Sequence, residues 1–321
     1  MNKKKRSHFN RFCHILFGLV WLFAMTQIGY AEKVDYCIEC HAEFNEDIVK
    51  AFSEDIHKST GLSCADCHGG DPTLNSEDAM DPDKGFVGAP DRINQPEFCG
   101  KCHSVPAVMH KYNTRISTDQ VGQYWTSQHG KNLKNGDQKV AVCASCHNAH
   151  GVTSPKSPSS KVYPTNIPET CGHCHADAEL MAEYGIPTTQ YEQYTDSTNV
   201  HGYALLVKRD ISAPTCNDCH GNHGAVPPGI KDIAFVCTQC HTLNGDLFQA
   251  SPHKEAFDAL EISECAFCHQ ASPDIDKPHQ NIHNIVRSNY ALIGTGKRKL
   301  CGQCHSSGDK GWETANLIES L

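Results

Sequence analysis

The string Cys-x-x-Cys-His occurs nine times in this chain and constrains its fold more than any other feature. Together the copies use 18 of the 19 cysteines, so thiol placement is organised almost entirely by this motif. The copies are numbered motif 1 to motif 9 in chain order and begin at Cys37, Cys64, Cys99, Cys143, Cys171, Cys216, Cys237, Cys265 and Cys301.

Each copy has the spacing of a c-type haem attachment site. Because residues i, i+3 and i+4 share one face of a helical turn, two thiols can bond the porphyrin while the following His reaches the iron. Zinc ribbons and disulfide frameworks also pair cysteines, but neither requires a His after every second Cys. His fills only 21 of 321 positions, yet it follows the second Cys in all nine copies. We therefore predict nine covalently attached c-type haems.

The motifs define two sets of cofactor-binding residues. The predicted covalent attachment residues are Cys37, Cys40, Cys64, Cys67, Cys99, Cys102, Cys143, Cys146, Cys171, Cys174, Cys216, Cys219, Cys237, Cys240, Cys265, Cys268, Cys301 and Cys304. The predicted proximal iron ligands are His41, His68, His103, His147, His175, His220, His241, His269 and His305.

Histidines outside the motifs are candidates for the second axial ligand that a six-coordinate iron needs. His173 lies between the two cysteines of motif 5, where it cannot turn back to its own iron, and we exclude it from the set. Beyond residue 31 the remaining non-motif histidines equal the motifs in number. The candidate distal ligands are His57, His110, His129, His150, His201, His223, His253, His279 and His283.

Local sequence context divides these candidates into groups. Two of them follow a motif at a fixed spacing, in Cys-x-x-Cys-His-x-x-His strings that end at His150 and His223. Four others share a loose pattern of an aromatic residue followed by the His shortly before a motif, which predicts that one structural unit is reused. His110 has no such frame, and His279 and His283 compete over four residues. The four that share the loose pattern are His57, His129, His201 and His253.

The ratio of polypeptide to cofactor predicts the fold class. Residues 32–321 would supply only about 32 residues per haem, too few for an ordinary hydrophobic core. We therefore predict a mainly α-helical chain with extensive coil and little or no β-sheet, whose core is formed by the haems themselves. Helices are expected where Phe44, Ile48, Phe52 and Ile56 repeat every four residues, and at Ala176–Tyr184, Glu255–Leu260 and Trp312–Leu321.

A Pro- and Ser-rich stretch over residues 154–164 predicts a connector between two modules. Four motifs and four candidate distal histidines precede it, and five of each follow it. The sequence thus predicts a signal segment over 1–31, a tetrahaem module over 32–153 and a pentahaem module over 165–321.

The N-terminus has the pattern of a secretory signal peptide, with a basic start, an apolar stretch and a small-x-small ending at Ala31. Residues 12–31 are also long and apolar enough for an uncleaved membrane anchor, which is the alternative. Cleavage after Ala31 is the favoured interpretation, and it would place the chain in the periplasm or at the cell surface. Cys13 would then be removed.

The charge balance limits the possible partners. Removal of residues 1–31 would leave 23 Lys and Arg against 37 Asp and Glu, a net charge of −14. Nucleic acid is therefore excluded as a partner, and basic patches of other redox proteins or metal cations are favoured.

The Cys-x-x-Cys-His-x-x-His strings at Cys143–His150 and Cys216–His223 make the chain similar to the multihaem c-type cytochromes of anaerobic respiration. The resemblance implies closely packed bis-His haems, alternately stacked and perpendicular, that form a path for electrons. It also implies redox partners such as other cytochromes, a membrane quinol dehydrogenase, or metal and mineral acceptors. An electron carrier without a catalytic residue is the favoured interpretation.

Two other functions stay open. A multihaem reductase or oxidase of nitrogen or sulfur oxyanions would use one five-coordinate haem. The nitrite-reducing type commonly has Cys-x-x-Cys-Lys, which this chain lacks, and the hydroxylamine-oxidising type joins a tyrosine to a haem. A quinol-oxidising membrane cytochrome would require that residues 12–31 remain attached.

Overall fold

The structure is a computed structural model and describes residues 35–287, 300–306, 309–311 and 313. The predicted signal segment lies outside these residues, as does the predicted helix Trp312–Leu321 apart from residue 313. None of the described helices is long and apolar enough to cross a membrane.

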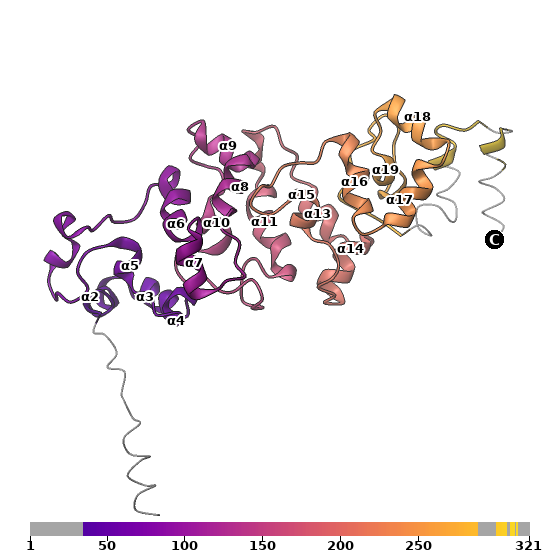
Figure 1. Cartoon of the computed structure of the whole chain (residues 1–321). Coiled ribbons are helices and arrows are strands. Elements are labelled where there is room, and N and C mark those ends of the chain that lie inside the picture. The colour runs from indigo at the N-terminus through magenta and orange to yellow at the C-terminus, as the bar shows by residue number, and fades with distance from the viewer. Residues whose placement is uncertain (1–34, 288–299, 307–308, 312, 314–321) are drawn as a thin grey trace, which may run out of the picture.

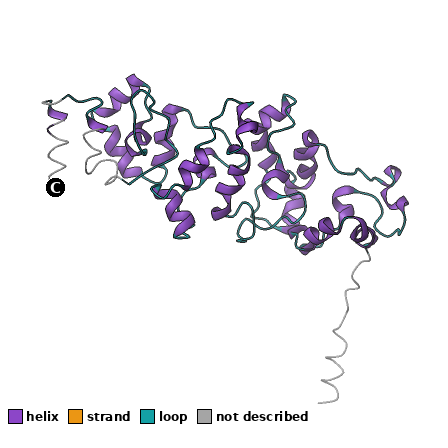
Figure 2. Cartoon of the chain, turned by 180° about the vertical axis from the view of Figure 1, so that it is seen from behind, coloured by secondary structure: helices purple, strands orange, loops and turns teal. Residues whose placement is uncertain are grey.

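Short helices follow one another in chain order along an elongated molecule, from α2 at one end to α19 near the other (Figure 1). The mainly helical prediction is confirmed, because the described residues form no strand and only one isolated bridge, between Gln270 and Ile285 (Figure 2). The α-helices are α2 (Tyr36–Phe44), α3 (Glu46–Ser53), α4 (Ile56–Ser59), α5 (Cys64–His68), α6 (Gln95–His103), α7 (Pro106–Tyr112), α8 (Gln120–Thr126), α9 (Gln128–Lys134), α10 (Cys143–His147), α11 (Ile167–His175), α12 (Ala178–Ala182), α13 (Gln190–Thr195), α14 (Val200–Gly202), α15 (Cys216–His220), α16 (Ile233–Thr238), α17 (Thr242–Gln249), α18 (His253–Leu260) and α19 (Glu264–His269).

Shorter 3-10 turns and one π-helical turn connect these helices. They are η1 (Glu77–Met80), η2 (Pro82–Lys84), η3 (Arg92–Asn94), η4 (Pro164–Asn166), η5 (Tyr203–Val207) and η6 (Ile230–Asp232).

Motifs 2 to 6 occupy two kinds of helix in alternation. Motifs 2, 4 and 6 each form a five-residue helix that begins at the first cysteine, namely α5, α10 and α15. The side chain of the third residue in these helices caps the helix start. In α5, for example, the Asp66 carboxylate accepts a hydrogen bond from the backbone N–H of Ser63 at 2.7 Å. Motifs 3 and 5 instead end the nine-residue helices α6 and α11, whose second residue is a buried proline. Proline is suited to that position because the first-turn N–H groups have no partner within the helix.

This alternation defines a repeat unit that contains a histidine, an even-numbered motif and the odd-numbered motif after it. The leading histidines are called box histidines here, and each lies in the first turn or at the first residue of a short helix. The four units run over residues 57–103, 129–175, 201–241 and 253–305, and their box histidines are His57, His129, His201 and His253.

A buried polar side chain caps the helix of the first three box histidines, two residues earlier in the chain. Asp55 accepts from the N–H of His57 at 2.8 Å, Ser127 accepts from Gly130 at 2.9 Å, and Asn199 accepts from His201 and Gly202 at 3.0 Å. All three caps are at most 2% exposed. Such a cap fixes the backbone direction at the start of the helix and hence the direction of the imidazole.

Units 2 and 3 share further contacts that fix the box relative to the even-numbered motif. The hydroxyl of Tyr124 donates to the carbonyl of Ala141 at 2.9 Å, and that of Tyr194 donates to Pro214 at 2.7 Å. Both carbonyls lie two residues before the first cysteine of the motif. The aromatic residue of the predicted repeat therefore ties the box to its motif.

Conventional packing is sparse. One cluster contains Tyr124, Leu133, Val140 and Val142, and another surrounds Phe257 and Phe267 near α19. In the predicted four-residue repeat Phe52 is buried, but Phe44 is 75% exposed. The polypeptide alone therefore leaves large apolar side chains uncovered, as expected if much of the core belongs to a cofactor.

The Pro- and Ser-rich segment at 154–164 folds into turns and is not extended. The side-chain amide of Asn166 donates to the carbonyls of Pro158 and Ser160 at 2.8 Å each, and Thr170 donates to Lys161 at 2.8 Å. The composition of the segment could not show these turns, because the hydrogen bonds that close them come from residues after position 164.

The approach of Gly130 to Tyr124 gives a first prediction. A Cβ at Gly130 would lie 2.0 Å from the Tyr124 carbonyl oxygen, so Gly130→Ala should destabilise the haem-loaded protein by about 1–3 kcal/mol in denaturant unfolding. Gly122→Ala is the matched control, because no atom lies within 4 Å of its Cβ and alanine favours the helix. Equal stability of the two variants would contradict the packing described here.

Candidate haem-binding sites

Consecutive motifs are neighbours in space along the whole described array. The first cysteines of motifs 3 and 4, Cys99 and Cys143, share a hydrogen bond. The same bond joins the first cysteines of motifs 5 and 6 and those of motifs 7 and 8. At motifs 1 and 2, Cys37 and Cys64 are close enough for the charge of one thiolate to raise the pKa of the other.

The junctions between these pairs use the second cysteines. Burial raises the pKa of Cys67, Cys146 and Cys219. A neighbouring thiolate of the next motif adds to the rise, from Cys102, Cys174 and Cys240 respectively. Cys268 has the same relation to both cysteines of motif 9. The array therefore alternates without interruption between first-cysteine and second-cysteine junctions, so the sites follow one another in sequence order.

The structure brings seven motif histidines to seven candidate distal histidines. In every pair the ring centres lie 6.0–6.4 Å apart. The pairs are His57 with His103, His68 with His150, His129 with His175, His147 with His223, His201 with His241, His220 with His283, and His253 with His305.

This separation fits a shared iron atom. A metal bonded to one nitrogen of each of two imidazoles, with bonds of about 2 Å, holds the ring centres about 6 Å apart. Directly stacked rings would lie closer, and unrelated surface histidines would not repeat one distance seven times. The residues therefore fit bis-His haem, although ligation itself stays a prediction.

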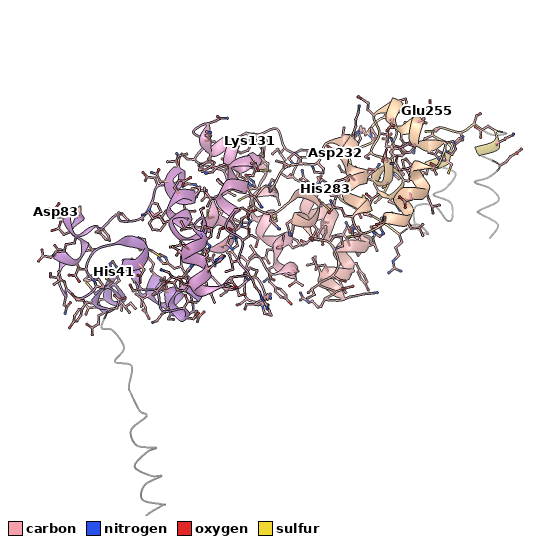
Figure 3. The ribbon with its side chains drawn as sticks, in the orientation of Figure 1. His41, Asp83, Lys131, Asp232, Glu255 and His283 are labelled. Atoms are coloured by element: carbon pink, nitrogen blue, oxygen red, sulfur yellow. The ribbon has the colours of Figure 1, made fainter. Side chains whose placement is uncertain are left out.

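The pairs follow a simple rule. Each box histidine meets the odd-numbered motif of its own unit, as His57 meets His103. A second group of histidines, called returning histidines, follows motifs 4, 6 and 8. Each of them pairs with the even-numbered motif of the preceding unit. They are His150, His223 and His283. Figure 3 shows His283 close to α15, which carries His220, although the chain reaches it only after α19.

One repeated backbone bond joins each returning segment to the preceding unit. The N–H of Ile56 donates to Val152 at 2.8 Å, that of Gln128 to Ala225 at 3.0 Å, and that of Val200 to Ile285 at 2.7 Å. The donor always comes directly before a box histidine, and the acceptor is always two residues after a returning histidine. This inter-unit bond fixes which segment supplies the second ring of motifs 2, 4 and 6.

Burial sets the protonation of these rings. Desolvation lowers the pKa of His129, His147, His175 and His220, and it lowers the pKa of His283 to about 4. A lowered pKa keeps an imidazole neutral at neutral pH, which leaves a nitrogen lone pair available for a metal.

Some rings are also oriented by their second nitrogen. Nδ1 of His57 lies 2.8 Å from the Asp55 carboxylate, and Nδ1 of His68 lies 2.9 Å from the carbonyl of Gly88. Donation from Nδ1 fixes the tautomer and leaves Nε2 free to bind a metal.

The remaining histidines are not paired by ring contacts within the described residues. These are the motif histidines His41 and His269 and the candidates His110 and His279. His110 is exposed on α7, whereas Nδ1 of His279 is buried without a hydrogen-bond partner. His173 is exposed and makes no described ring contact, in keeping with its exclusion.

Sequence reasoning missed the buried caps that position the box histidines. The predicted pattern named an aromatic residue before the His, but not the polar residues two positions before the box, which are Asp55, Ser127, Asn199 and Ser251. Their shared property is the ability to cap a helix, and this signal was available in the sequence.

Residues 56–176 match the family model of cytochrome c3. The matched range contains the first two repeat units, from the residue before His57 to the residue after His175. No curated protein and no solved structure matches the chain. The family match supports a multihaem c-type cytochrome with covalently bound haem and a role in electron transfer.

The pairing of His147 with His223 gives a second prediction. His223→Ala should convert one haem from low spin to high spin, because motif 4 loses its returning ring. The His173→Ala variant is the control, since His173 is exposed and should leave the spectrum unchanged. Electronic absorption and electron paramagnetic resonance of the purified proteins would measure both. A wild-type spectrum for His223→Ala would show that this pairing does not ligate iron.

The predicted division into two modules gives a third. Contacts cross residues 154–164, including the pairs His129 with His175 and His147 with His223 and the Lys139–Glu183 ion pair at 2.6 Å. A protease site placed at 155–159 should therefore allow nicking while the two halves elute together with an unchanged low-spin spectrum. Separation of two low-spin halves would support independent modules.

Proposed function

We propose that this chain is an exported nonahaem cytochrome that carries electrons between redox partners in anaerobic respiration. The observation that carries the proposal is the unbroken order of neighbouring motifs, combined with seven imidazole pairs of one separation. Closely spaced sites extend along the molecule in sequence order. Haems at these sites could pass electrons from one to the next along the whole chain.

Bound haem would supply the one-electron redox centre, and the protein residues would determine its properties. Two imidazoles hold an iron low-spin, so reduction requires little rearrangement of ligands. Histidine in place of methionine as second ligand also lowers the reduction potential. Met109 and Met181 are buried within helices, and with Met80 they are too few to change that pattern.

The alternation of junctions supports the stacked and perpendicular arrangement that the multihaem resemblance implies. At three of the four first-cysteine junctions the two thiols share a hydrogen bond, so haems attached there would approach each other at these edges. Second-cysteine junctions have more widely separated thiols, which affect each other only through charge. Two different junctions in strict alternation are what two alternating haem contacts would require.

Partner and location follow from charge and from the N-terminal pattern. A net charge of −14 on residues 32–321 favours docking onto basic surfaces of other cytochromes or a membrane quinol dehydrogenase, or onto metal and mineral acceptors. The N-terminal pattern of a signal peptide, together with the predicted covalent haem attachment, favours the periplasm or the cell surface.

Haem stoichiometry and turnover test this proposal. The intact mass should exceed that of the mature polypeptide by nine haems, and most haems should be low-spin with negative potentials. Electron exchange with a soluble cytochrome or chelated ferric iron should be rapid, while nitrite and hydroxylamine turnover stays negligible. Eight or fewer haems would refute the nonahaem assignment, and substantial turnover of either substrate would favour the enzyme alternative.

A further inference from the structure

Motif 8 differs from the other even-numbered motifs in its second ring. Motifs 2, 4 and 6 each receive a returning histidine from the following unit, as His220 receives His283. Among the described residues, no imidazole makes a ring contact with His269. The reason lies in the fourth box.

The inter-unit bond cannot form at the fourth box. In the first three boxes the donor is the N–H of the residue before the box histidine, at Ile56, Gln128 and Val200. The equivalent residue of the fourth box is Pro252, which has no N–H. A returning segment that arrived at this box would bury a carbonyl without its partner, at a cost of about 1–3 kcal/mol.

The fourth box also differs at its start, because α18 begins at His253 with Pro252 at the N-cap and has no side-chain cap. Asp55 and Asn199 bond the returning segment directly, through Val152 N–H at 2.8 Å and the His283 carbonyl at 2.7 Å. Oγ of Ser251 is buried and has no hydrogen-bond partner. Ser127 of the second box makes no such bond to a described returning segment, so the feature that separates the fourth unit from the other three is the missing N–H donor before the box histidine.

Side chains near motif 8 are engaged elsewhere. Lys254, directly after the box histidine, forms ion pairs with Asp258 and, at 3.2 Å, with Glu264. The loop that carries His279 is fixed to Gln270, whose amide donates to Pro278 at 3.0 Å and accepts from Asn281 at 3.2 Å. Among the described residues, no ring contact joins His279 to His269.

We propose that the distal side of the haem held by His269 is open to a small ligand from solution. The ligand class is a diatomic molecule or small anion that binds iron end-on through carbon, nitrogen or oxygen. This inference rests on the proposed function, since it requires haem at motif 8. It adds a binding site to a chain that otherwise only transfers electrons.

A second copy of the chain is the competing occupant. A copy that docked in the manner of a following unit would need the N–H that Pro252 lacks. The array therefore favours a small ligand, and dependence of ligand uptake on protein concentration becomes an outcome of the test.

Carbon monoxide titration of the reduced full-length holoprotein tests the proposal. Wild type should bind at least one equivalent, and Cys265→Ala/Cys268→Ala should bind one fewer while its intact mass falls by one haem. His283→Ala is the matched control and should gain one equivalent, because motif 6 loses its returning ring. An unchanged equivalent count after loss of the motif 8 haem would overturn the inference.

His279→Ala provides a second route that leaves the motif intact, should the double variant not mature. Its carbon monoxide uptake should equal that of wild type, whereas a gain of one equivalent would identify His279 as the distal ligand and refute an open site. Uptake that appears only on dilution would assign the position to a second copy. Nine haems by mass together with no carbon monoxide binding would refute this inference and leave the proposed function intact.

Discussion

The approach of two imidazole rings from different chain segments is the interaction on which the rest of the structure depends. Each pair joins a motif to a segment outside it, and in three pairs that segment belongs to the next repeat unit. Each of the first three units therefore borrows a ring from its successor, much as a solenoid repeat completes its core with a neighbour. Contacts stay local along the array, and the result is an elongated chain of sites in sequence order.

Borrowed rings explain why polar groups are buried where the apolar core is thin. Asp55 and Asn199 serve two purposes, because each caps a helix and binds the backbone of the returning segment. Both sets of bonds satisfy backbone groups that would otherwise be buried without partners. Hydrogen bonds thus fix the direction of each imidazole. The exposed apolar side chains leave a surface that a cofactor would cover.

Much of this organisation could be predicted from the sequence, because the motif fixes both the helical turn and the cofactor. The mainly helical fold was predicted correctly, and seven of the nine candidate histidines meet a motif histidine. The partners themselves could not be predicted, because a spacing such as that of His223 states where a ring starts and not which unit it enters. The composition of residues 154–164 suggested separate modules. It gave no sign of the histidine pairs that cross the segment, because those histidines lie far from it in the sequence. The two-module division remains a prediction that these contacts weigh against.

The fourth unit differs from the first three at the position that would receive a returning segment. Pro252 makes this difference, because it lacks the N–H that binds the returning segment in each of the first three units, while the box histidine beside it still pairs with His305. Loss of the donor affects motif 8 and spares motif 9. If both motifs hold haem as proposed, one unit would have two tasks: motif 9 would continue the path for electrons, and motif 8 would offer the open position proposed above.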